Sequence, residues 1–319
     1  MSVTITPEAL ANSAAKYRKE LLMMPVIALK ASLDHMTLRI GVRGKETVGQ
    51  LSGSMEVGPY SATRKDETGV GAKGRELETF LGSVIKEFEP NTVAKSIYGD
   101  AVLSGAGLTD VKIVQLVVAF LAKQVSKALN KVLWSAVRNV EGSTSADLFN
   151  GFDTITATEI AAGNITVAKG NLFEFDAAIS ATNCVDKLKE FFRAAYEELQ
   201  GEATKMFISK LIYNAYVDDY QASNASVPYN KEFKKTFLEG SDDMCELVAL
   251  SNKKASPYIH LTTKGNMLVG VDQESDEEKI GVEKHAALIL QFVIVMFFGV
   301  QFESISPERL LVGKLFVQA

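Results

Sequence analysis

Apolar residues recur every three or four positions in several stretches of the chain, which is the period of a helix with one buried face. The clearest stretch begins after Thr109, a capping residue, and continues to Arg138. At about 1.5 Å per residue such a helix would be roughly 45 Å long, longer than a compact domain is wide. The full set of expected helices is 6–25, 108–138, 183–199, 208–220 and 231–238.

A period of two residues, typical of strands that bury one face, begins at Thr37, where Leu38, Ile40 and Val42 alternate with Arg or Gly. The second half of the chain contains apolar runs of strand length at 258–261, 267–271, 286–300 and 310–317. Helices and strands do not alternate regularly, which favours an α+β fold over a doubly wound α/β sheet.

Between the first strand and the long helix lies a segment that cannot form a core of its own. The range 41–75 contains eight of the chain's 23 glycines and a single aromatic residue, Tyr60. It therefore offers too little apolar surface to offset the entropy lost on ordering it. Apolar patterning resumes at 76–88, as expected if a second strand returns beside the first. We predict a long two-stranded flap that projects from the body of the protein.

Composition places the chain among ordinary globular proteins. Its 319 residues are enough for two packed domains, and 47% of them are hydrophobic. The formal net charge of −5 argues against a protein whose main function is to bind nucleic acid, because phosphate binding depends on clustered Lys and Arg. Two cysteines are too few for a disulfide framework and indicate a reducing compartment. The apolar run most like a membrane segment, 286–300, is shorter than the roughly 20 residues of a spanning helix, so we expect no membrane contact.

One glycine pattern resembles a nucleotide-binding motif. Gly69, Gly71 and Gly74 have the G-x-G-x-x-G spacing of a dinucleotide-binding loop. That loop joins a buried strand to a helix, and the surrounding sequence predicts neither element. We interpret the three glycines as part of the flap and expect no bound cofactor.

Catalytic and metal-binding constellations are not evident in the sequence. His35, His260 and His285 stand apart from one another and from acidic partners that would form a zinc or base site, so we expect them to be structural. The acidic run 272–278 departs from the spacing of a calcium-binding loop. Cys184 begins an expected helix, which is a hint of a lowered thiol pKa, although a small apolar core residue is the simpler interpretation. We predict no catalytic residue, no metal site and no enzyme activity.

The order of the expected elements resembles the Hong Kong 97-like capsid fold of tailed bacteriophages, which has an N-terminal arm, an extended two-stranded loop, a very long helix, a mixed domain and terminal strands. Several segments are also similar to the capsid proteins of phages that infect Bacteroidetes. These segments are DLFNGFDTI at 147–155, EIAAGNI at 159–165, YNKEFKKTFLEG at 229–240 and NMLVGVD at 266–272. The resemblance extends from about Tyr17 to the C-terminus.

The resemblance implies a division of the chain into five parts. These are an N-terminal arm at 1–36, an extended β-hairpin loop at 37–88, a peripheral domain at 89–148 with a spine helix at 108–138, a mostly axial domain at 149–283, and C-terminal strands at 284–319 that return to the peripheral domain. The extended loop would lie over a neighbouring subunit. Its candidate intersubunit residues are Lys45, Tyr60, Lys65, Gly69, Gly71, Lys73 and Gly74. Some members of the fold crosslink a loop lysine to a neighbour's asparagine, so the three lysines are also candidates for such a bond.

The resemblance further implies a structural protein that self-assembles into an icosahedral head shell around double-stranded DNA. Its partners would be copies of itself in pentamers and hexamers, a portal, and a separate scaffolding protein, since the arm begins almost at Met1. DNA would be enclosed without sequence-specific binding, and the shell would form in the host bacterial cytoplasm and become part of the virion.

Two alternatives remain open. An encapsulin-type nanocompartment shell would use the same fold and contain a cargo enzyme instead of DNA. A cytoplasmic nucleotide-binding enzyme would use the glycine pattern of the flap, and a dinucleotide or ATP would then stabilise it against unfolding.

Overall fold

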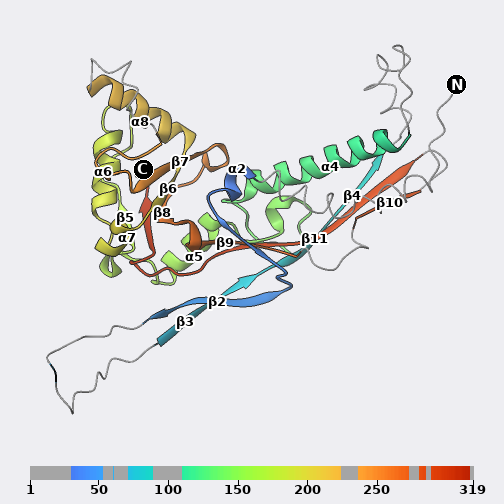
Figure 1. Cartoon of the computed structure of the whole chain (residues 1–319), viewed down its shortest axis with the longest axis horizontal. Coiled ribbons are helices and arrows are strands. Elements are labelled where there is room, and N and C mark those ends of the chain that lie inside the picture. The colour runs from blue at the N-terminus through green and yellow to red at the C-terminus, as the bar shows by residue number, and fades with distance from the viewer. Residues whose placement is uncertain are drawn as a thin grey trace.

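The computed structural model describes residues 30–52, 60, 71–88, 110–223, 236–272, 280–284 and 289–316. Within these ranges the chain forms two five-stranded sheets, a separate two-stranded hairpin, and helices that pack on the sheets. Figure 1 shows an elongated molecule in which one sheet and its helices form the body at one end and a long ribbon of strands reaches the other end. The mixture of helices and sheets confirms the expected α+β class.

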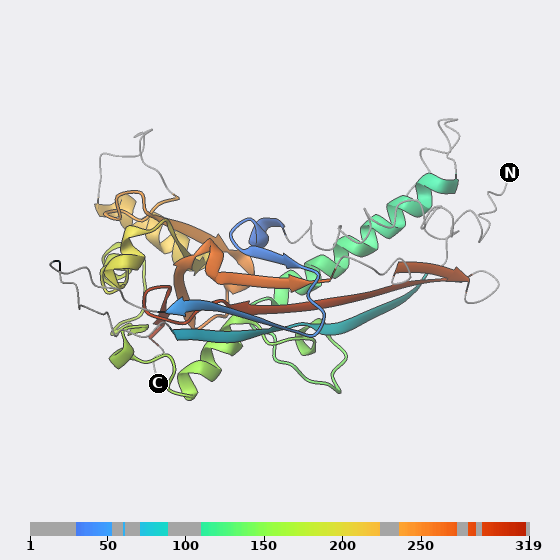
Figure 2. The same cartoon turned by 60° about the horizontal axis from the view of Figure 1, so that its bottom comes forward.

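The first sheet is built around β11 (Leu290–Phe302), a 13-residue strand of mostly β-branched and aromatic residues. β4 (Phe80–Phe88) pairs antiparallel along one edge of β11. On the other edge β11 pairs first with β10 (Ile280–Lys284) and then with β9 (Met267–Val271), and β9 pairs parallel with β1 (Thr37–Ile40). Strands from distant parts of the sequence therefore meet on one long strand, and β4, β10 and β11 continue together into the ribbon (Figure 2).

A long helix, α4 (Asp110–Val132), runs beside this ribbon. The short helix α2 (Lys30–Leu33) lies near the C-terminal end of α4 (Figure 1). α4 occupies most of the expected range 108–138 but ends earlier, so its 23 residues reach roughly 34 Å at about 1.5 Å per residue. Of the N-terminal arm expected at 1–36, residues 1–29, with the expected helix 6–25, lie outside the described residues.

The helix ends early because the chain after it pairs with another segment. The carbonyl oxygens of Trp134 and Ala136 accept hydrogen bonds from the backbone N–H groups of Asp153 and Gly151, at 3.0 and 2.8 Å. A β-carbon at Gly151 would overlap the Trp134 carbonyl group. Only a glycine permits this close approach, which turns Leu133 and Trp134 into the core.

The second sheet has the order β5–β12–β8–β6–β7 and forms the body, at the end of the molecule opposite the tip of the ribbon. Its strands are β5 (Leu172–Glu174), β12 (Leu310–Lys314), β8 (Tyr258–Thr263), β6 (Thr204–Ser209) and β7 (Cys245–Leu250). The helices on its outer face are α6 (Cys184–Arg193), α7 (Glu197–Gly201) and α8 (Lys210–Ser223). The buried residues of α6 recur at helical spacing and pack against the sheet.

This sheet has a hydrophobic core on each face. In β6, Met206 and Ile208 point into the core beneath α6 and α8, whereas Phe207 belongs to the other core. That second core also contains Val269 of β9 and Phe298 of β11, so it joins the two sheets. α5 (Phe152–Ala161) and the loop around Trp134 lie at this junction.

Three further helices differ from the expected ones. The range 183–199 is divided between α6 and α7, because Ala194 caps the first helix and Tyr196 has an extended backbone. The first two residues of the expected helix 208–220 form the end of β6, so α8 starts at Lys210. The range 231–238 falls mostly outside the described residues, and its end is not helical, since the Leu238 N–H donates to the Cys245 carbonyl.

Two groups of strands also differ from the expected arrangement. The range 37–88 divides into β1, a hairpin of β2 (Lys45–Ser52) with β3 (Gly71–Glu78), and β4, which leaves the hairpin at Thr79 to pair with β11. β12 does not return beside the ribbon with β11. It lies between β5 and β8, because Val312 fills one core of the second sheet and Leu311 the other.

Four 3₁₀ turns connect the elements of the described ranges: η1 (Ser145–Asp147), η2 (Val167–Lys169), η3 (Ser251–Lys253) and η4 (Lys264–Asn266). Of the helices that the structure describes, none combines the length and the apolar character that crossing a membrane requires.

Candidate intersubunit surface

The hairpin of β2 and β3 projects from the body of the molecule (Figures 1 and 2). Near its base, Val48 and Leu77 are 5% and 0% exposed and pack with Val42 and Leu268 in a small core of their own. Beyond the paired glycines 49 and 74, the sequence of the two strands contains only two apolar residues. The outer part of the hairpin therefore offers few apolar residues of its own for packing.

The base of the hairpin rests on a pair of glycines. Gly270 in β9 and Gly299 in β11 are cross-strand partners. A β-carbon at Gly299 would overlap the Glu78 carbonyl oxygen and lie 3.0 Å from Thr79 Cα, and one at Gly270 would lie 2.7 Å from Thr79 Cγ2. The two glycines thus allow the backbone between β3 and β4 to cross directly over the first sheet.

Hydrogen bonds hold the hairpin at the same point. The Thr79 hydroxyl donates to the Val42 carbonyl at 2.9 Å, and the Thr79 N–H donates to the Gly44 carbonyl at 2.7 Å. Arg75 makes a 2.6 Å ion pair with Glu159 of α5 and donates through Nε to the Phe302 carbonyl at 3.2 Å. These contacts connect the hairpin to both the first sheet and α5, so the body fixes the direction in which the hairpin points.

The seven residues predicted to lie at an intersubunit loop fall into three groups. Gly71, Lys73 and Gly74 lie in β3, and Lys45 lies at the start of β2. Tyr60, between the two strands, is 98% exposed. The other two, Lys65 and Gly69, lie outside the described residues. Because residues 71 and 74 pair within a strand and do not open a helix, their conformation is not that of a dinucleotide-binding loop.

The amine of Lys45 is held in its charged form. Its Nζ lies 3.1 Å from Glu76 Oε2, and this hydrogen bond, followed by the charges of Glu76 and Glu78, raises the pKa of Lys45. A protonated amine is not a nucleophile. In the subunit as it stands, Lys45 is therefore unsuited to the covalent crosslink considered for the loop lysines.

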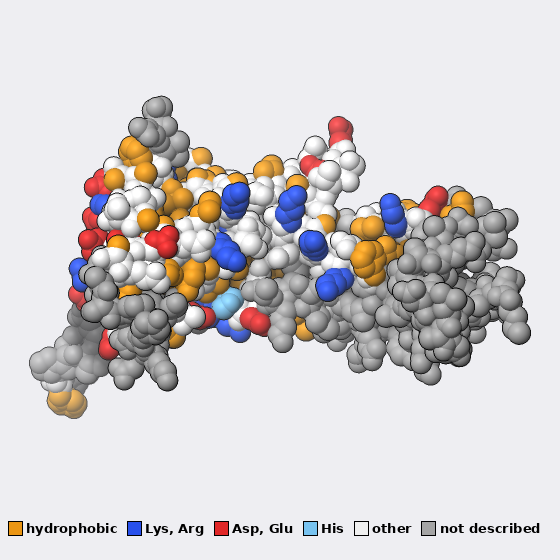
Figure 3. All heavy atoms as spheres, turned by 90° about the horizontal axis from the view of Figure 1, so that it is seen from above, with side chains coloured by type: hydrophobic (Ala, Val, Ile, Leu, Met, Phe, Trp, Pro, Cys, Tyr) orange, Lys and Arg blue, Asp and Glu red, His pale blue; other side chains and the backbone are white. Residues whose placement is uncertain are grey.

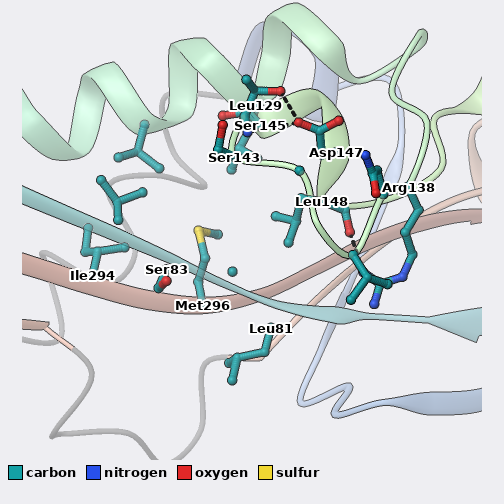
Figure 4. Close-up of a pocket in the computed structure, with 17 residues that line it drawn as sticks. Leu81, Ser83, Leu129, Arg138, Ser143, Ser145, Asp147, Leu148, Ile294 and Met296 are labelled. Carbon is teal, nitrogen blue, oxygen red and sulfur yellow. Dashed lines mark hydrogen bonds between the residues drawn. The ribbon is translucent and has the colours of Figure 1, made fainter.

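A second feature of this surface is a groove of about 490 Å³ between α4, the ribbon and the loop that follows α4 (Figure 4). Leu81, Ile294 and Met296 of the ribbon and Leu129 of α4 face into it, and Arg138 and Asp147 lie at its polar end. Leu81, in the groove, is 57% exposed, and outside the groove the ribbon also exposes Ile85 at 60%. An exposed apolar band of this kind is typical of a protein contact surface.

The most unusual buried group is a charged cluster at the junction of the two sheets. Lys253 of η3 is 1% exposed, and its Nζ lies 3.1 Å from Asp153 Oδ1 of α5, 2.9 Å from Ser256 Oγ and 3.1 Å from His260 Nδ1 of β8. The same Nζ lies 3.7 Å from the centroid of the Trp134 ring. Three acceptors and an aromatic face satisfy an ammonium group. Burial lowers the pKa of Lys253 to about 8, so the amine is still protonated at neutral pH.

The hydrogen bonds of this cluster also fix the state of His260. The Thr156 hydroxyl donates to the Phe152 carbonyl at 2.8 Å, so it accepts from His260 Nε2, 2.9 Å away. Nδ1 is then free of hydrogen and accepts from Lys253. Burial, followed by the charge of Lys253, holds the pKa of His260 well below its usual value. The histidine is therefore neutral, and both ring nitrogens are occupied by hydrogen bonds within the core.

This arrangement gives a pH dependence with a definite sign. Below about pH 6.5 an unfolded chain binds a proton at residue 260 and the folded chain does not, so the free energy of unfolding should fall as the pH drops, by up to about 1.4 kcal/mol per unit. We expect His260→Gln to flatten the dependence between pH 7 and pH 5, measured by urea unfolding. His35→Gln is the comparison: that ring is about a quarter exposed and its pKa is lowered less far, mainly by partial burial, so this change should flatten the dependence less. An unchanged slope in His260→Gln would contradict the assignment.

Both cysteines are equally enclosed. Burial raises the pKa of the Cys184 and Cys245 thiols to about 12, so the hint of a reactive thiol at the start of α6 is wrong. Across the part of the chain that the structure describes, no group of three or more His, Cys, Asp or Glu side chains is placed to hold a metal ion.

Sequence comparison gives no relative, since neither a protein-family model nor a curated protein matches the chain. Solved structures match almost its whole length. A chain of the satellite phage P4 procapsid aligns with a TM-score of 0.56 at 10% identity, covering 91% of this chain and 97% of that one. A chain of the native GTA particle capsid gives 0.51 at 11% identity over 90% and 91%, and one of the cyanophage A-1(L) capsid gives 0.51 at 15% identity over 93% and 94%. The chain has the Hong Kong 97-like capsid fold.

Proposed function

We propose that this chain is the major shell-forming subunit of a tailed-phage head, which encloses double-stranded DNA and carries out no catalysis. The fold supports this proposal, because its structural neighbours are capsid proteins. The observation that carries it is the hairpin, which the body fixes at its base and whose strands contain only two apolar residues beyond the paired glycines 49 and 74. A segment of this kind becomes ordered by packing on another copy.

In this proposal the subunits form pentamers and hexamers, and the hairpin of one copy lies on the body of the next. The apolar band of the ribbon and the groove beside α4 supply the kind of surface on which such a segment packs. Each contact is modest, and the closed shell is stable because every subunit makes several of them. A separate scaffolding protein, a portal, assembly in a bacterial cytoplasm and a host among the Bacteroidetes belong to the same proposal.

The test is a shortened hairpin. Val48 and Arg75 are cross-strand partners, so replacing residues 49–74 with Asn-Gly joins them by a two-residue turn that suits a hairpin. The small core at the base and the Arg75 contacts are retained. We expect the variant to fold, with an unfolding transition close to that of the full chain, and to form no shells.

The measurements are sedimentation and negative-stain electron microscopy, with and without the products of neighbouring genes. Lys210→Ala, which changes an exposed residue of α8 away from the hairpin, is the control and should assemble. Shells formed equally well by the shortened variant would contradict the role of the hairpin. If the unaltered chain forms neither rings nor shells under any condition, the proposed function is wrong.

The contents of the shell separate the proposal from its nearest alternative. Double-stranded DNA inside particles from infected cells would support a phage head, and a captured enzyme would indicate an encapsulin. The nucleotide-binding enzyme is not supported, because Gly71 and Gly74 lie in a paired strand.

A further inference from the structure

One face of α4 carries a row of lysines. Lys123, Lys127 and Lys131 are spaced four residues apart, so they lie on one side of the helix, and all three are exposed. The opposite side, with Ser126 and Leu129, is buried against the body. At about 1.5 Å per residue the row spans roughly 12 Å.

The row is not neutralised within the part of the chain that the structure describes. No carboxylate of the described residues forms an ion pair with these three lysines, although carboxylates pair with Lys45, Lys187, Lys253 and Lys314 elsewhere. α4 contains a single acidic residue, Asp110, at its other end. Like charges four residues apart destabilise a helix, so the row costs the isolated subunit stability.

The rest of this face extends the positive charge. η3 packs on the C-terminal end of α4 through hydrogen bonds from Asn252 to Asn130, and the next residue after η3 is the exposed Lys254. Figure 3, which looks down on the side of the molecule that carries α4 and α8, shows Lys and Arg gathered along the middle of the face. Acidic side chains gather mainly at the end that carries α6 and α8. The positive charge is therefore local, in a chain whose net charge is −5.

We propose that the lysine row of α4 binds the phosphate backbone of double-stranded DNA, so that this face lines the inside of the shell. The inference rests on the proposed function. Phosphates of one strand are spaced about 3.4 Å along the duplex axis, so a row of this length meets roughly three of them. Lysines supply point charges that do not distinguish base sequence, which suits DNA that is packed regardless of its sequence.

The composition of the row favours DNA over an acidic protein. The centres of protein interfaces are depleted in lysine and enriched in aromatic residues, and here a single aromatic side chain, Phe120, is exposed beside three lysines. The row also lies on a convex helix surface and not in a pocket, so an extended polyanion fits it better than a small anion does. Three contacts per subunit bind weakly, and many copies on one inner surface make the binding cumulative.

The test compares two triple variants of the full chain. Lys123, Lys127 and Lys131 are all replaced by glutamine, which keeps a high helix propensity. The control replaces Lys169, Lys210 and Lys314 by glutamine, which makes the same change in net charge on η2, α8 and β12. Binding to a fluorescently labelled DNA duplex is measured by anisotropy at several salt concentrations, and particle formation is checked by electron microscopy.

We expect the α4 variant to lose most of its affinity for the duplex at low salt. Its plot of log affinity against log salt should become less steep by about 0.9 per lysine removed, and the control should keep the slope of the unaltered chain. Equal binding by both variants, with shells still formed, would overturn the inference and leave the proposed function intact. If the α4 variant binds DNA normally and fails only to assemble with an acidic partner protein, the row is a protein-binding surface and the inference is again wrong.

Discussion

Replacing Asp153 with alanine should lower the free energy of unfolding of the subunit by about 3–5 kcal/mol. The reason is the charge that the substitution leaves behind. Lys253 is 1% exposed, and Asp153 is the one carboxylate among the described residues that pairs with it. Without that carboxylate, the amine must either remain charged in the core or lose its proton, and both cost free energy.

The cluster also explains why the loss should reach the whole subunit. Asp153 lies in the first turn of α5, Lys253 in η3 and His260 in β8, so the cluster connects three elements at the junction of the two sheets. Trp134 lies in the core two residues after the end of α4, and its ring packs against the same amine. Breaking the pair therefore disturbs the core that joins the sheets.

A double-mutant cycle measures this effect without relying on a single variant. Asp153→Ala, Lys253→Met and the double variant are compared by urea unfolding at pH 7. Methionine keeps the length of the lysine side chain and removes its charge, so the double variant should be clearly more stable than Asp153→Ala alone. If the two single changes simply add, the pair contributes no coupling and its assigned role is wrong.

The regular elements were predictable because their patterns are local. The stripe through α4 and the alternation in β1 follow from periods of 3.6 and two residues, and both elements are present. The flap was predictable from what it lacks: with eight glycines and one aromatic residue in 41–75, its core is limited to a small cluster at the base. The limits of these elements were less predictable, because tertiary contacts determine them. α4 stops at Val132 since the chain after it pairs with Gly151 and Asp153.

The contacts that position the hairpin depend on residues far apart in sequence, and local patterns indicate them only in part. Gly270 and Gly299 each interrupt an apolar strand pattern, which is a known sign of a close backbone approach. No local sequence pattern identifies Thr79 as the residue that approaches both glycines. The Asp153–Lys253 pair spans 100 positions and has no sequence signature either. The groove beside α4 was missed for the same reason, since the ribbon and the loop after the helix both line it.

The glycine pair connects these structural details to assembly. A hairpin that must reach a neighbouring copy has to leave the body in a defined direction, because a small rotation at its base moves its tip a long way. The direction is defined where the backbone of Glu78 and Thr79 lies on Gly270 and Gly299. A change at this point should therefore affect assembly even in a subunit that still folds.

Gly299→Ala should destabilise the subunit by about 3 kcal/mol or more, because its β-carbon would overlap a backbone carbonyl that cannot move without displacing β3. Gly270→Ala should have a smaller effect, since its β-carbon meets the side chains of Thr79 and Leu77. Gly265→Ala is the control, because space around that residue is open, and it should change stability by less than about 0.5 kcal/mol. Unfolding in urea measures the three effects, and electron microscopy measures assembly under conditions in which each variant is folded.

A rescue distinguishes a blocked approach from a general loss of stability. Thr79→Ser removes the methyl group that lies 2.7 Å from a β-carbon at position 270 and keeps the hydroxyl that donates to the Val42 carbonyl. Combined with Gly270→Ala, it should recover stability and shell formation together. It should not rescue Gly299→Ala, because there the obstacle is the Glu78 carbonyl oxygen. If serine rescues both variants or neither, the crossing does not set the direction of the hairpin, and the contacts of Arg75 with Glu159 and the Phe302 carbonyl must set it instead.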